Sequence, residues 1–400
     1  MTAPHFGTGP ADSGGHPAAN GPLAGIRVLE LAGLAPGPFA GMMLADHGAE
    51  VLRIERVSVP AETLSTTSLS QTADARRAGD DVLDRGKQTI GLDLKRPEGV
   101  AALKRLAENV DVLIEVYRPG VAERLGIGPA DMHAVNERLV YGRLTGWGQD
   151  GPLAPAAGHD LDYLAISGVL SQLGRAGERP TPPVNLLADF AGGGLLLAYG
   201  VLLALVERAG TGRGQVVDAA MTDGSALLFG LFFPAVLSGT WGPRGTNLLD
   251  SGAPMYDTYR TADGGYVAVA PLEPAFWDRM CERMGLTDLP DRTDRGRWPE
   301  LRRRLEQAFL GRTRAEWEKV FEGSDACVFP VLEIAEAPGH PHNAARRAHI
   351  EVGGVLQPAP APRLTGHIPA PAAARRLDDL TDWGISTEES AHLRRIGVLT

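Results

Sequence analysis

The sequence contains few cysteines and lacks a long uninterrupted apolar run. Cys281 and Cys327 are its two cysteines among 400 residues, too few for a disulfide framework, so we expect free thiols in a reducing compartment. The longest apolar stretch, residues 193–205, is shorter than the roughly 20 residues that cross a bilayer and predicts a buried helix. We therefore expect a cytoplasmic protein that does not enter the membrane.

An excess of basic residues is also absent. Lys and Arg number 39 against 49 Asp and Glu, which gives a formal net charge of −10. Affinity for nucleic acid comes largely from cationic side chains that neutralise phosphates, so this balance argues against a nucleic-acid partner. An anionic small molecule would need a local cluster of Lys and Arg.

The glycine fingerprint of dinucleotide-binding proteins is missing as well. Residues 26–54 predict a strand, a helix and a second strand, the way such proteins begin. The turn at 32–41 (AGLAPGPFAG) has prolines where a pyrophosphate needs bare glycine backbone. A nicotinamide cofactor is therefore not expected.

The later segments predict two domains. Apolar runs at 90–94, 110–116 and 139–144 predict strands alternating with helices, hence an α/β large domain with a parallel sheet. An Asp-Gly turn at 263–264 predicts a β-hairpin, and the amphipathic helices after it favour a smaller α+β domain. The expected divisions are a disordered leader at 1–21, the large domain at 22–225, the small domain at 226–330, and an extended return segment with C-terminal helices packing on the large domain at 331–400. Residues 57–84 lack a period and are expected to form a mobile loop or lid.

Several basic residues lie near the predicted ends of strands. In an open parallel sheet, anionic ligands bind at the carboxyl ends of the strands, where Arg offers a fork for phosphate and Lys a point charge. The spacing fits scattered solvated charge equally well. The candidates are Arg56, Arg85, Lys87, Arg118 and Arg124.

Two Gly-flanked segments carry a candidate pair of proton-transfer groups. His159 lies between Gly158 and Asp160, and Asp189 precedes a run of three glycines at 192–194. Inverting a carbon by moving a proton needs one base on each face, and an imidazole and a carboxyl group can fill these roles. Taken alone, a loop histidine and a helix N-cap aspartate are the commoner explanations.

Five motifs then carry a resemblance to a known family. LAGIRVLEL (23–31) and ADHGAEVLRIER (45–56) are very similar to the opening of the family III CoA transferases, the CaiB/BaiF superfamily. Within it, GWGQDGP (146–152), AGHD (157–160) and NLLAD (185–189) resemble the racemase branch, the α-methylacyl-CoA racemases. With these motifs around them, His159 and Asp189 are better explained as proton-transfer groups than as a loop histidine and a helix N-cap.

The resemblance runs from about residue 22 to 370 and implies a fold and a ligand. Members of this family bind acyl-CoA without a metal or redox cofactor and serve lipid metabolism. They have a Rossmann-like large domain and a smaller domain, and they form interlocked homodimers. Each active site then lies between the large domain of one subunit and the small domain of the other.

The resemblance also implies roles for individual residues. His159 and Asp189 would be the two bases, with Asn185 supporting Asp189. Glu273 would orient His159, although a solvated loop carboxylate is an equal alternative, and Asp160 is either catalytic support or simply the first-turn acid of a helix. The residues expected to bind CoA are Arg56, Arg85, Lys87, Tyr117, Arg118, Arg124 and Tyr256.

Three functions remain to be weighed. The first is a cofactor-independent racemase that interconverts (2R)- and (2S)-2-methylacyl-CoA through an enolate, whose oxygen the first N–H groups of a helix after Gly158 would hold. The second is a CoA transferase in which Asp189 attacks the thioester to form a mixed anhydride. The third is a non-enzymatic acyl-CoA binder. A transferase needs only the carboxylate, so His159 favours the racemase.

Overall fold

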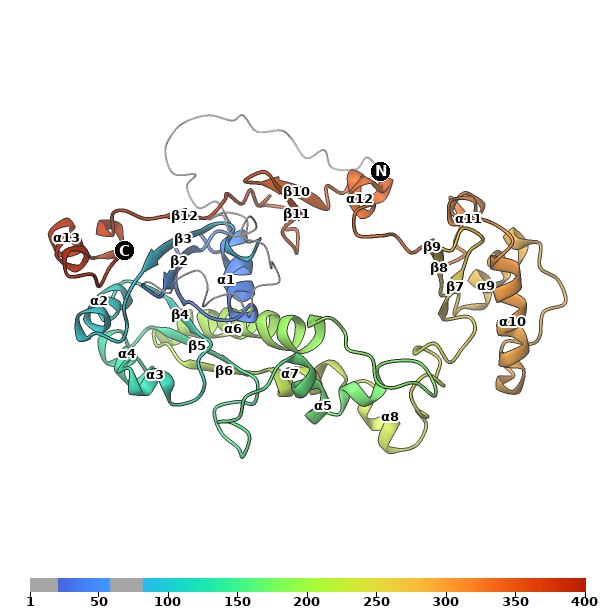
Figure 1. Ribbon diagram of the computed structural model, residues 1–400, viewed down its shortest axis with the longest axis horizontal. Coiled ribbons are helices and arrows are strands. Elements are labelled where there is room, and N and C mark those ends of the chain that lie inside the picture. The colour runs from blue at the N-terminus through green and yellow to red at the C-terminus, as the bar shows by residue number, and fades with distance from the viewer. Residues whose placement is uncertain (1–20, 58–81) are drawn as a thin grey trace. The chain divides into compact units, whose positions relative to one another are not determined.

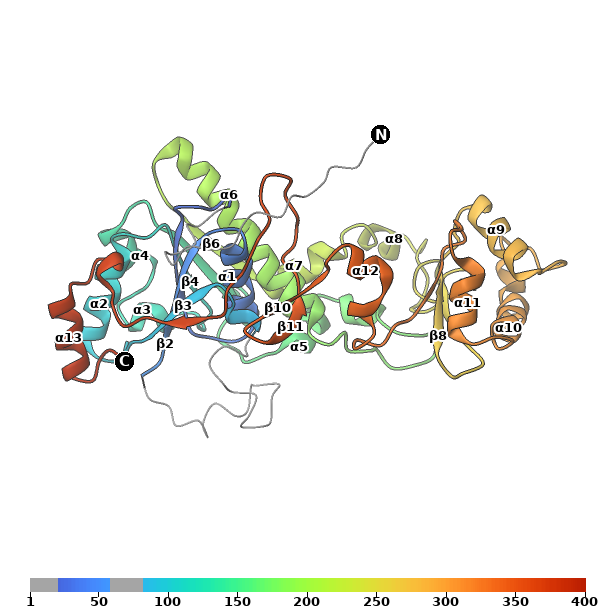
Figure 2. The same ribbon diagram turned by 90° about the horizontal axis from the view of Figure 1, so that it is seen from above.

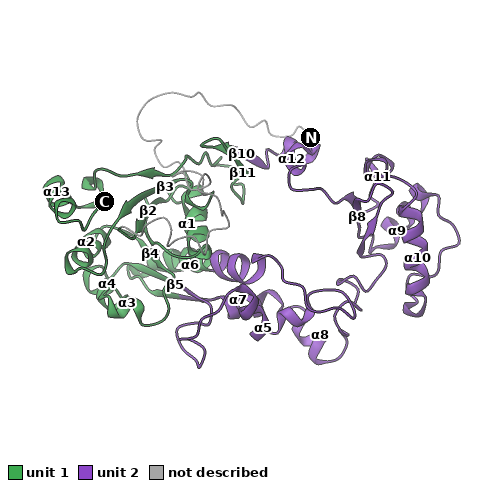
Figure 3. Cartoon of the chain, in the orientation of Figure 1, with its two compact units in different colours: residues 1–143, 197–217, 351–400 green, residues 144–196, 218–350 purple. Residues whose placement is uncertain are grey.

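The computed structural model describes residues 21–57 and 82–400 (Figure 1). The predicted leader at 1–21 and lid at 57–84 therefore fall almost wholly outside the described residues. The chain divides into two compact units, coloured separately in Figure 3. Unit 1 comprises Met1–Arg143, Leu197–Val217 and Glu351–Thr400, and unit 2 comprises Leu144–Leu196 and Asp218–Ile350. These divisions differ from the predicted ones because the chain crosses between the units several times.

Unit 1 is built on a seven-stranded sheet of order β12-β3-β2-β1-β4-β5-β6. The paired strands β2-β1, β1-β4, β4-β5, β2-β3 and β3-β12 run parallel, which confirms the predicted α/β fold. The central strands are buried over almost their full length, as expected where helices cover both faces of a parallel sheet. The strands are β1 (Arg27–Leu31), β2 (Glu50–Glu55), β3 (Lys87–Gly91), β4 (Val112–Glu115), β5 (Val140–Thr145), β6 (Val216–Ala220) and β12 (Arg375–Arg376).

Three helices of unit 1, α1, α2 and α4, begin with proline. The first N–H of a helix has no partner within the helix, so a residue without an N–H is tolerated there. C-terminal residues such as Leu380 and Trp383 share one core with Leu29 and Leu103 of the sheet and α2. Helix α13 lies beside α2 in both views (Figure 1, Figure 2), where Arg105 pairs with Glu389. The helices are α1 (Pro36–Asp46), α2 (Pro97–Ala107), α3 (Val121–Arg124), α4 (Pro129–Val135), α6 (Leu196–Thr211) and α13 (Thr387–Arg395), with 3-10 turns η2 (Val82–Asp84) and η7 (Thr381–Trp383) and a two-stranded sheet of β10 (His349–Val352) and β11 (Val355–Pro358).

Unit 2 contains two groups of elements. The first is helical and includes the segments that carry the candidate bases. The second has a three-stranded antiparallel sheet, which confirms the predicted hairpin, packed with three helices around Tyr259, Phe309 and Trp317. The elements are α5 (Asp160–Ile166), η3 (Val169–Gln172), the π-helix η4 (Leu186–Leu195), α7 (Met221–Leu228), α8 (Phe233–Leu237), β7 (Asp257–Arg260), β8 (Tyr266–Val269), α9 (Pro274–Met284), η5 (Arg295–Arg297), α10 (Trp298–Phe309), α11 (Arg314–Phe321), β9 (Val328–Pro330), η6 (Ala337–Gly339) and α12 (Pro341–Ala345).

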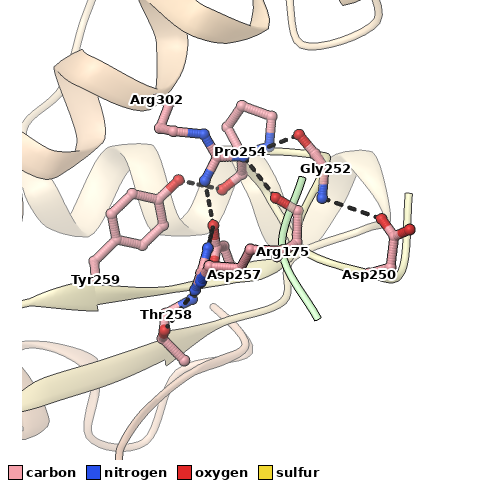
Figure 4. Close-up of polar contacts among 9 residues, drawn as sticks. Arg175, Asp250, Gly252, Pro254, Asp257, Thr258, Tyr259 and Arg302 are labelled. Atoms are coloured by element: carbon pink, nitrogen blue, oxygen red, sulfur yellow. Dashed lines mark hydrogen bonds and ion pairs between the residues drawn. The ribbon is translucent and has the colours of Figure 1, made fainter. Parts of the chain in front are cut away.

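A buried carboxylate joins the two groups of unit 2 (Figure 4). The side chain of Asp257 is 2% exposed and accepts hydrogen bonds from both Arg175, at 2.6 and 3.1 Å, and Arg302. Burial acts to raise the pKa of Asp257, but the hydrogen bonds from Arg175, the Thr258 N–H and Arg302, with the charge of Arg175, together hold it below its ordinary value. The contact ties the loop that precedes η4 to the antiparallel sheet.

The π-helix η4 and α6 form one continuous helix over Leu186–Thr211. By length and composition its 26 residues could cross a membrane, and 39% of its most apolar window is buried. The helix extends on both sides of the apolar run at 193–205 from which it was predicted. A core helix of a soluble protein passes the same test, so this finding alone is weak evidence for a membrane.

Backbone contact between two glycines sets the distance from α7 to η4. A methyl group at Gly224 would lie within 2.8 Å of the Gly192 Cα, and one at Gly192 would lie 2.9 Å from the Ser225 nitrogen. A side chain at either position would push the helices apart.

Gly224→Ala should therefore lower the free energy of unfolding by about 1–3 kcal/mol, because this contact leaves no space for a methyl group. Gly210→Ala is the matched control, since Gly210 lies exposed in α6 with open space around it. The control should stabilise the protein by about 0.5–1 kcal/mol through its helix propensity. Urea unfolding measures both, and equal effects would contradict the close contact.

Candidate active site

The Asp160 carboxylate ties together the two segments that carry the candidate bases. Asp160 is the first residue of α5 and is 3% exposed. Its Oδ2 accepts hydrogen bonds from the backbone N–H groups of Ala188 and Asp189, both at 2.9 Å. These groups lie in the first turn of η4, where a helix supplies no acceptor of its own. The carboxylate therefore serves the neighbouring helix rather than only its own.

The start of η4 has an unusual backbone. Val184 and Asn185 both adopt the left-handed region, with φ of 57° and 59°. Asn tolerates this conformation, whereas for the β-branched Val184 it is strained. The turn allows the Asn185 Nδ2 to donate to the Asp189 Oδ2 at 2.9 Å. Asn185 thus lies where the sequence predicted a support for Asp189.

The surroundings of Asp189 favour its protonated form. Burial is the largest effect and raises the pKa of Asp189 above its ordinary value. The hydrogen bond from Asn185 lowers it, the nearby charge of Asp160 raises it, and that of His159 lowers it. The net rise makes Asp189 a better proton donor at neutral pH than an ordinary aspartate. The Asp160 carboxylate, which binds the Asp189 N–H, directly follows His159 in the chain and so holds the two segments together.

His159 precedes α5 as its N-cap residue. Its own N–H donates to the Asp162 Oδ2 at 3.0 Å, and its carbonyl accepts from the Asp162 N–H at 2.8 Å. Within the described residues, the N–H groups of Asp160 and Leu161 have no acceptor. They are the first donors of the helix and can hold an anionic oxygen.

Arg85 and Lys87, predicted to bind CoA, are engaged with the protein itself. Arg85 is 4% exposed and pairs with Asp46 through bonds of 2.9 and 2.6 Å. Lys87 is 1% exposed and donates to Glu30 at 2.7 Å and to the Pro38 carbonyl at 2.9 Å. These buried pairs argue against the predicted contacts with a ligand.

The other predicted CoA-binding residues of unit 1 are accessible. The side chains of Arg56, Arg118 and Arg124 are exposed, and none forms an ion pair with any described residue. Burial raises the pKa of Tyr117, and the charge of Arg56 partly offsets this rise. Three guanidinium groups in this unit thus remain available to an anion.

Glu273 and Tyr256 lie with the antiparallel sheet of unit 2. Glu273 is the N-cap residue of α9, and its charge raises the pKa of the Cys327 thiol, together with burial as the larger effect. Across the described ranges 21–57 and 82–400, no hydrogen bond or ion pair joins Glu273 to His159 or Asp189. Within one chain, therefore, Glu273 does not orient His159 as predicted through a hydrogen bond or an ion pair of the described residues.

Sequence reasoning missed two side chains that contact the His159 segment, Asp162 and Tyr163. The three-residue spacing from His159 to Asp162 resembles a capping box and could have indicated the first contact. The second, a hydrogen bond from the Tyr163 hydroxyl to the Gly158 carbonyl, leaves no signal in the spacing.

Comparison with known proteins places this geometry in a family. Residues 23–377 match CoA-transferase family III. The chain belongs to this family. It is 45% identical to α-methylacyl-CoA racemase of Mus musculus over 382 residues, which span 93% of this chain and 96% of that protein. The Homo sapiens α-methylacyl-CoA racemase is 44% identical over 378 residues, 92% of this chain and 94% of that one.

Other members of family III are CoA transferases. The chain is 34% identical to succinyl-CoA–D-citramalate CoA-transferase of Chloroflexus aurantiacus over 273 residues, 67% of this chain and 66% of that protein. The crystal structure of Rv3272 from M. tuberculosis has a TM-score of 0.73 at 27% identity and covers 90% of this chain and 97% of its own. The family resemblance inferred from the motifs is confirmed, and the higher identity lies with the racemases.

The raised pKa of Asp189 predicts a pH-dependent stability difference for Asp189→Asn. A carboxyl group whose pKa is higher in the folded protein stabilises it fully below the ordinary value of 3.8, and this contribution is lost as pH rises through the folded value. Asparagine does not titrate. The free energy of unfolding of the variant, relative to the unsubstituted protein, should therefore rise across this window and level off above it. Urea unfolding at several pH values measures this, and a constant or falling difference would contradict the raised pKa.

Proposed function

We propose that this family III protein is an α-methylacyl-CoA racemase that interconverts (2R)- and (2S)-2-methylacyl-CoA. The observation that carries the proposal is that two different proton-transfer groups, His159 and Asp189, lie on segments joined by the hydrogen bonds of the Asp160 carboxylate. Identity of 45% to a racemase over 93% of the chain supports it.

The chemistry uses one group to remove the α-proton and the other to return it. The neutral imidazole of His159 accepts the proton from one epimer, and protonated Asp189 delivers one to the opposite face. In the reverse direction the two groups exchange roles. The reaction transfers no electrons, so a redox cofactor has no part in it, and coenzyme A is a portion of the substrate.

The enolate between these two steps needs a place for its charge. The N–H groups of Asp160 and Leu161, which have no acceptor among the described residues, suit its oxygen. Donors of this kind contribute about 3–4 kcal/mol each in oxyanion holes. In unit 1, Arg56, Arg118 and Arg124 are the candidates for the phosphates of CoA, beside Tyr117. Arg85 and Lys87 are left out of this set because of their buried pairs.

A CoA transferase with Asp189 as nucleophile is the alternative, since family III also includes transferases. Such an enzyme needs an ionised carboxylate. The raised pKa of Asp189 and the neighbouring imidazole both favour proton transfer instead.

Incubation of the protein with a single epimer of a 2-methylacyl-CoA in D₂O tests the proposal. Two-base proton transfer should give both epimers, each with α-deuterium. His159→Ala should lower the rate of inversion by at least about 100-fold, the scale of general acid–base catalysis. Recovery of the unlabelled starting epimer, or transfer of CoA to an added carboxylate without α-exchange, would reject the racemase.

We further propose a cytoplasmic homodimer that binds neither membrane nor nucleic acid and acts in lipid metabolism. The α6 helix carries an apolar stripe at helical spacing, and such a stripe is more often covered by protein than left in water. Its residues are Tyr199, Leu202, Leu203 and Val206, which are 56%, 38%, 51% and 74% exposed. A second copy, as the family resemblance implies, would cover this stripe and bring its own Glu273 to the site.

Mixing two inactive variants tests such a shared site. When His159→Ala and Glu273→Ala subunits exchange, half of the dimers are mixed and each has one intact site, so about a quarter of the activity should return. His159→Ala mixed with Asp189→Ala is the control and should recover none, because both groups come from the same subunit. A monomeric mass in solution, or equal recovery in both mixtures, would contradict the shared site.

A further inference from the structure

Two aromatic side chains pack behind the segment that carries His159. Trp147 lies in the loop after β5 and Tyr163 lies in α5, and their rings meet edge to face with centroids 4.8 Å apart at 85°. Neither residue belongs to the proton-transfer machinery described above. The motif at 146–152, which contains Trp147, has so far supported the family resemblance only, and no role in the reaction has been assigned to it.

Two glycines bring the backbone against these rings. A methyl group at Gly158 would lie 2.7 Å from the Tyr163 Cε1 and 2.9 Å from the Trp147 Cζ2. One at Gly146 would overlap the Tyr163 ring. The chain just before His159 is thus enclosed by aromatic surface and has no room to shift toward it.

The peptide group between Gly158 and His159 is also held at both of its polar atoms. Its carbonyl accepts a hydrogen bond from the Tyr163 hydroxyl, and its N–H donates to the Asp162 Oδ2 at 3.0 Å. A planar peptide group held at both of its polar atoms fixes the position of the next Cα, from which the side chain extends. The place of the His159 imidazole in the site therefore depends on the Tyr163 hydroxyl.

The residue before Trp147, Gly146, is hydrogen-bonded to α7, the helix that packs against η4. The Gly146 carbonyl accepts from the Thr222 N–H at 3.0 Å and from its hydroxyl at 2.7 Å, and Thr222 lies in α7. Through Gly224 and Gly192, α7 contacts η4, which carries Asp189. The aromatic pair behind His159 and the helix that carries Asp189 are thus both held by α7.

We propose that Tyr163 and Trp147 are positioning residues, which act through His159 and set its imidazole opposite Asp189. The proposal rests on the proposed racemase function. It assigns a role to one face of the site, because the ring packing and the hydrogen bond of these two residues are made to the segment that precedes His159.

The test compares α-deuterium exchange from each pure epimer in D₂O for Tyr163→Phe. In a two-base racemase each base deprotonates one epimer, so displacement of His159 slows exchange from one epimer and spares the other. Displacement of a catalytic group by about 1 Å can cost about 100-fold. We expect racemisation to fall by roughly 10- to 100-fold, and the ratio of the two exchange rates to change by about tenfold or more.

Tyr259→Phe is the matched control. The Tyr259 hydroxyl donates to the Pro254 carbonyl at 2.6 Å and the side chain is 2% exposed, so the same group is removed elsewhere in unit 2 (Figure 4). This change should leave the ratio of the two exchange rates as it is in the unsubstituted protein, whatever it does to stability.

Trp147→Phe gives an independent result if Tyr163→Phe does not fold. The Trp147 Nε1 has no hydrogen-bond partner among the described residues, so this substitution removes ring packing only. It should shift the exchange ratio in the same direction by a smaller factor. An unchanged ratio in the variants that fold, or unchanged racemisation, would overturn the positioning role alone. Absence of exchange in the unsubstituted protein would overturn the proposed function and this role together.

Discussion

The geometry of the candidate site depends on one buried carboxylate. Asp160 is 3% exposed, and removing a charge from water is costly unless strong hydrogen bonds replace its hydration. Two backbone N–H groups at the positive end of η4 supply them, at 2.9 Å each. Because Asp160 directly follows His159 in sequence, these bonds limit how far the imidazole can move from Asp189. The same negative charge adds to the rise in the pKa of Asp189.

The two units use different means to hold their functional residues. In unit 2, glycine contacts between α7 and η4 fix the helices at backbone distance, and Asp160 fixes the segments at their ends. In unit 1, buried ion pairs such as Arg143 with Glu115 at 2.7 Å join the strands near their carboxyl ends. Among the described residues of unit 1, exposed arginines outside these pairs, such as Arg56, remain accessible to a ligand. Burial thus separates structural arginines from candidate binding arginines.

Much of the fold could be predicted from the sequence. Buried strands in a parallel sheet are continuous apolar runs, so the predicted strand at 26–31 contains the observed β1, and the Asp-Gly turn located the β7-β8 hairpin. The bounds of the compact units differ from the predicted ones, because secondary-structure patterns do not reveal that the chain crosses between units at 143, 196, 217 and 350.

The candidate site was predicted in part and for a specific reason. Sequence motifs indicated His159, Asp189 and Asn185, because each of these residues lies within a short contiguous motif. Arg85 and Lys87 were placed with the ligand because spacing does not show their partners, which lie in other elements. The left-handed pair at 184–185 and the Tyr163 contact also follow from tertiary packing, which hydrophobic periodicity does not report.

A crystal structure with a bound 2-methylacyl-CoA is the most direct test of the central claim. The account predicts that the His159 imidazole and the Asp189 carboxyl lie on opposite faces of the α-carbon. It also predicts the thioester oxygen within hydrogen-bond distance of the Asp160 N–H. Both groups on one face of that carbon, or Asp189 directed at the thioester carbonyl carbon instead, would contradict it.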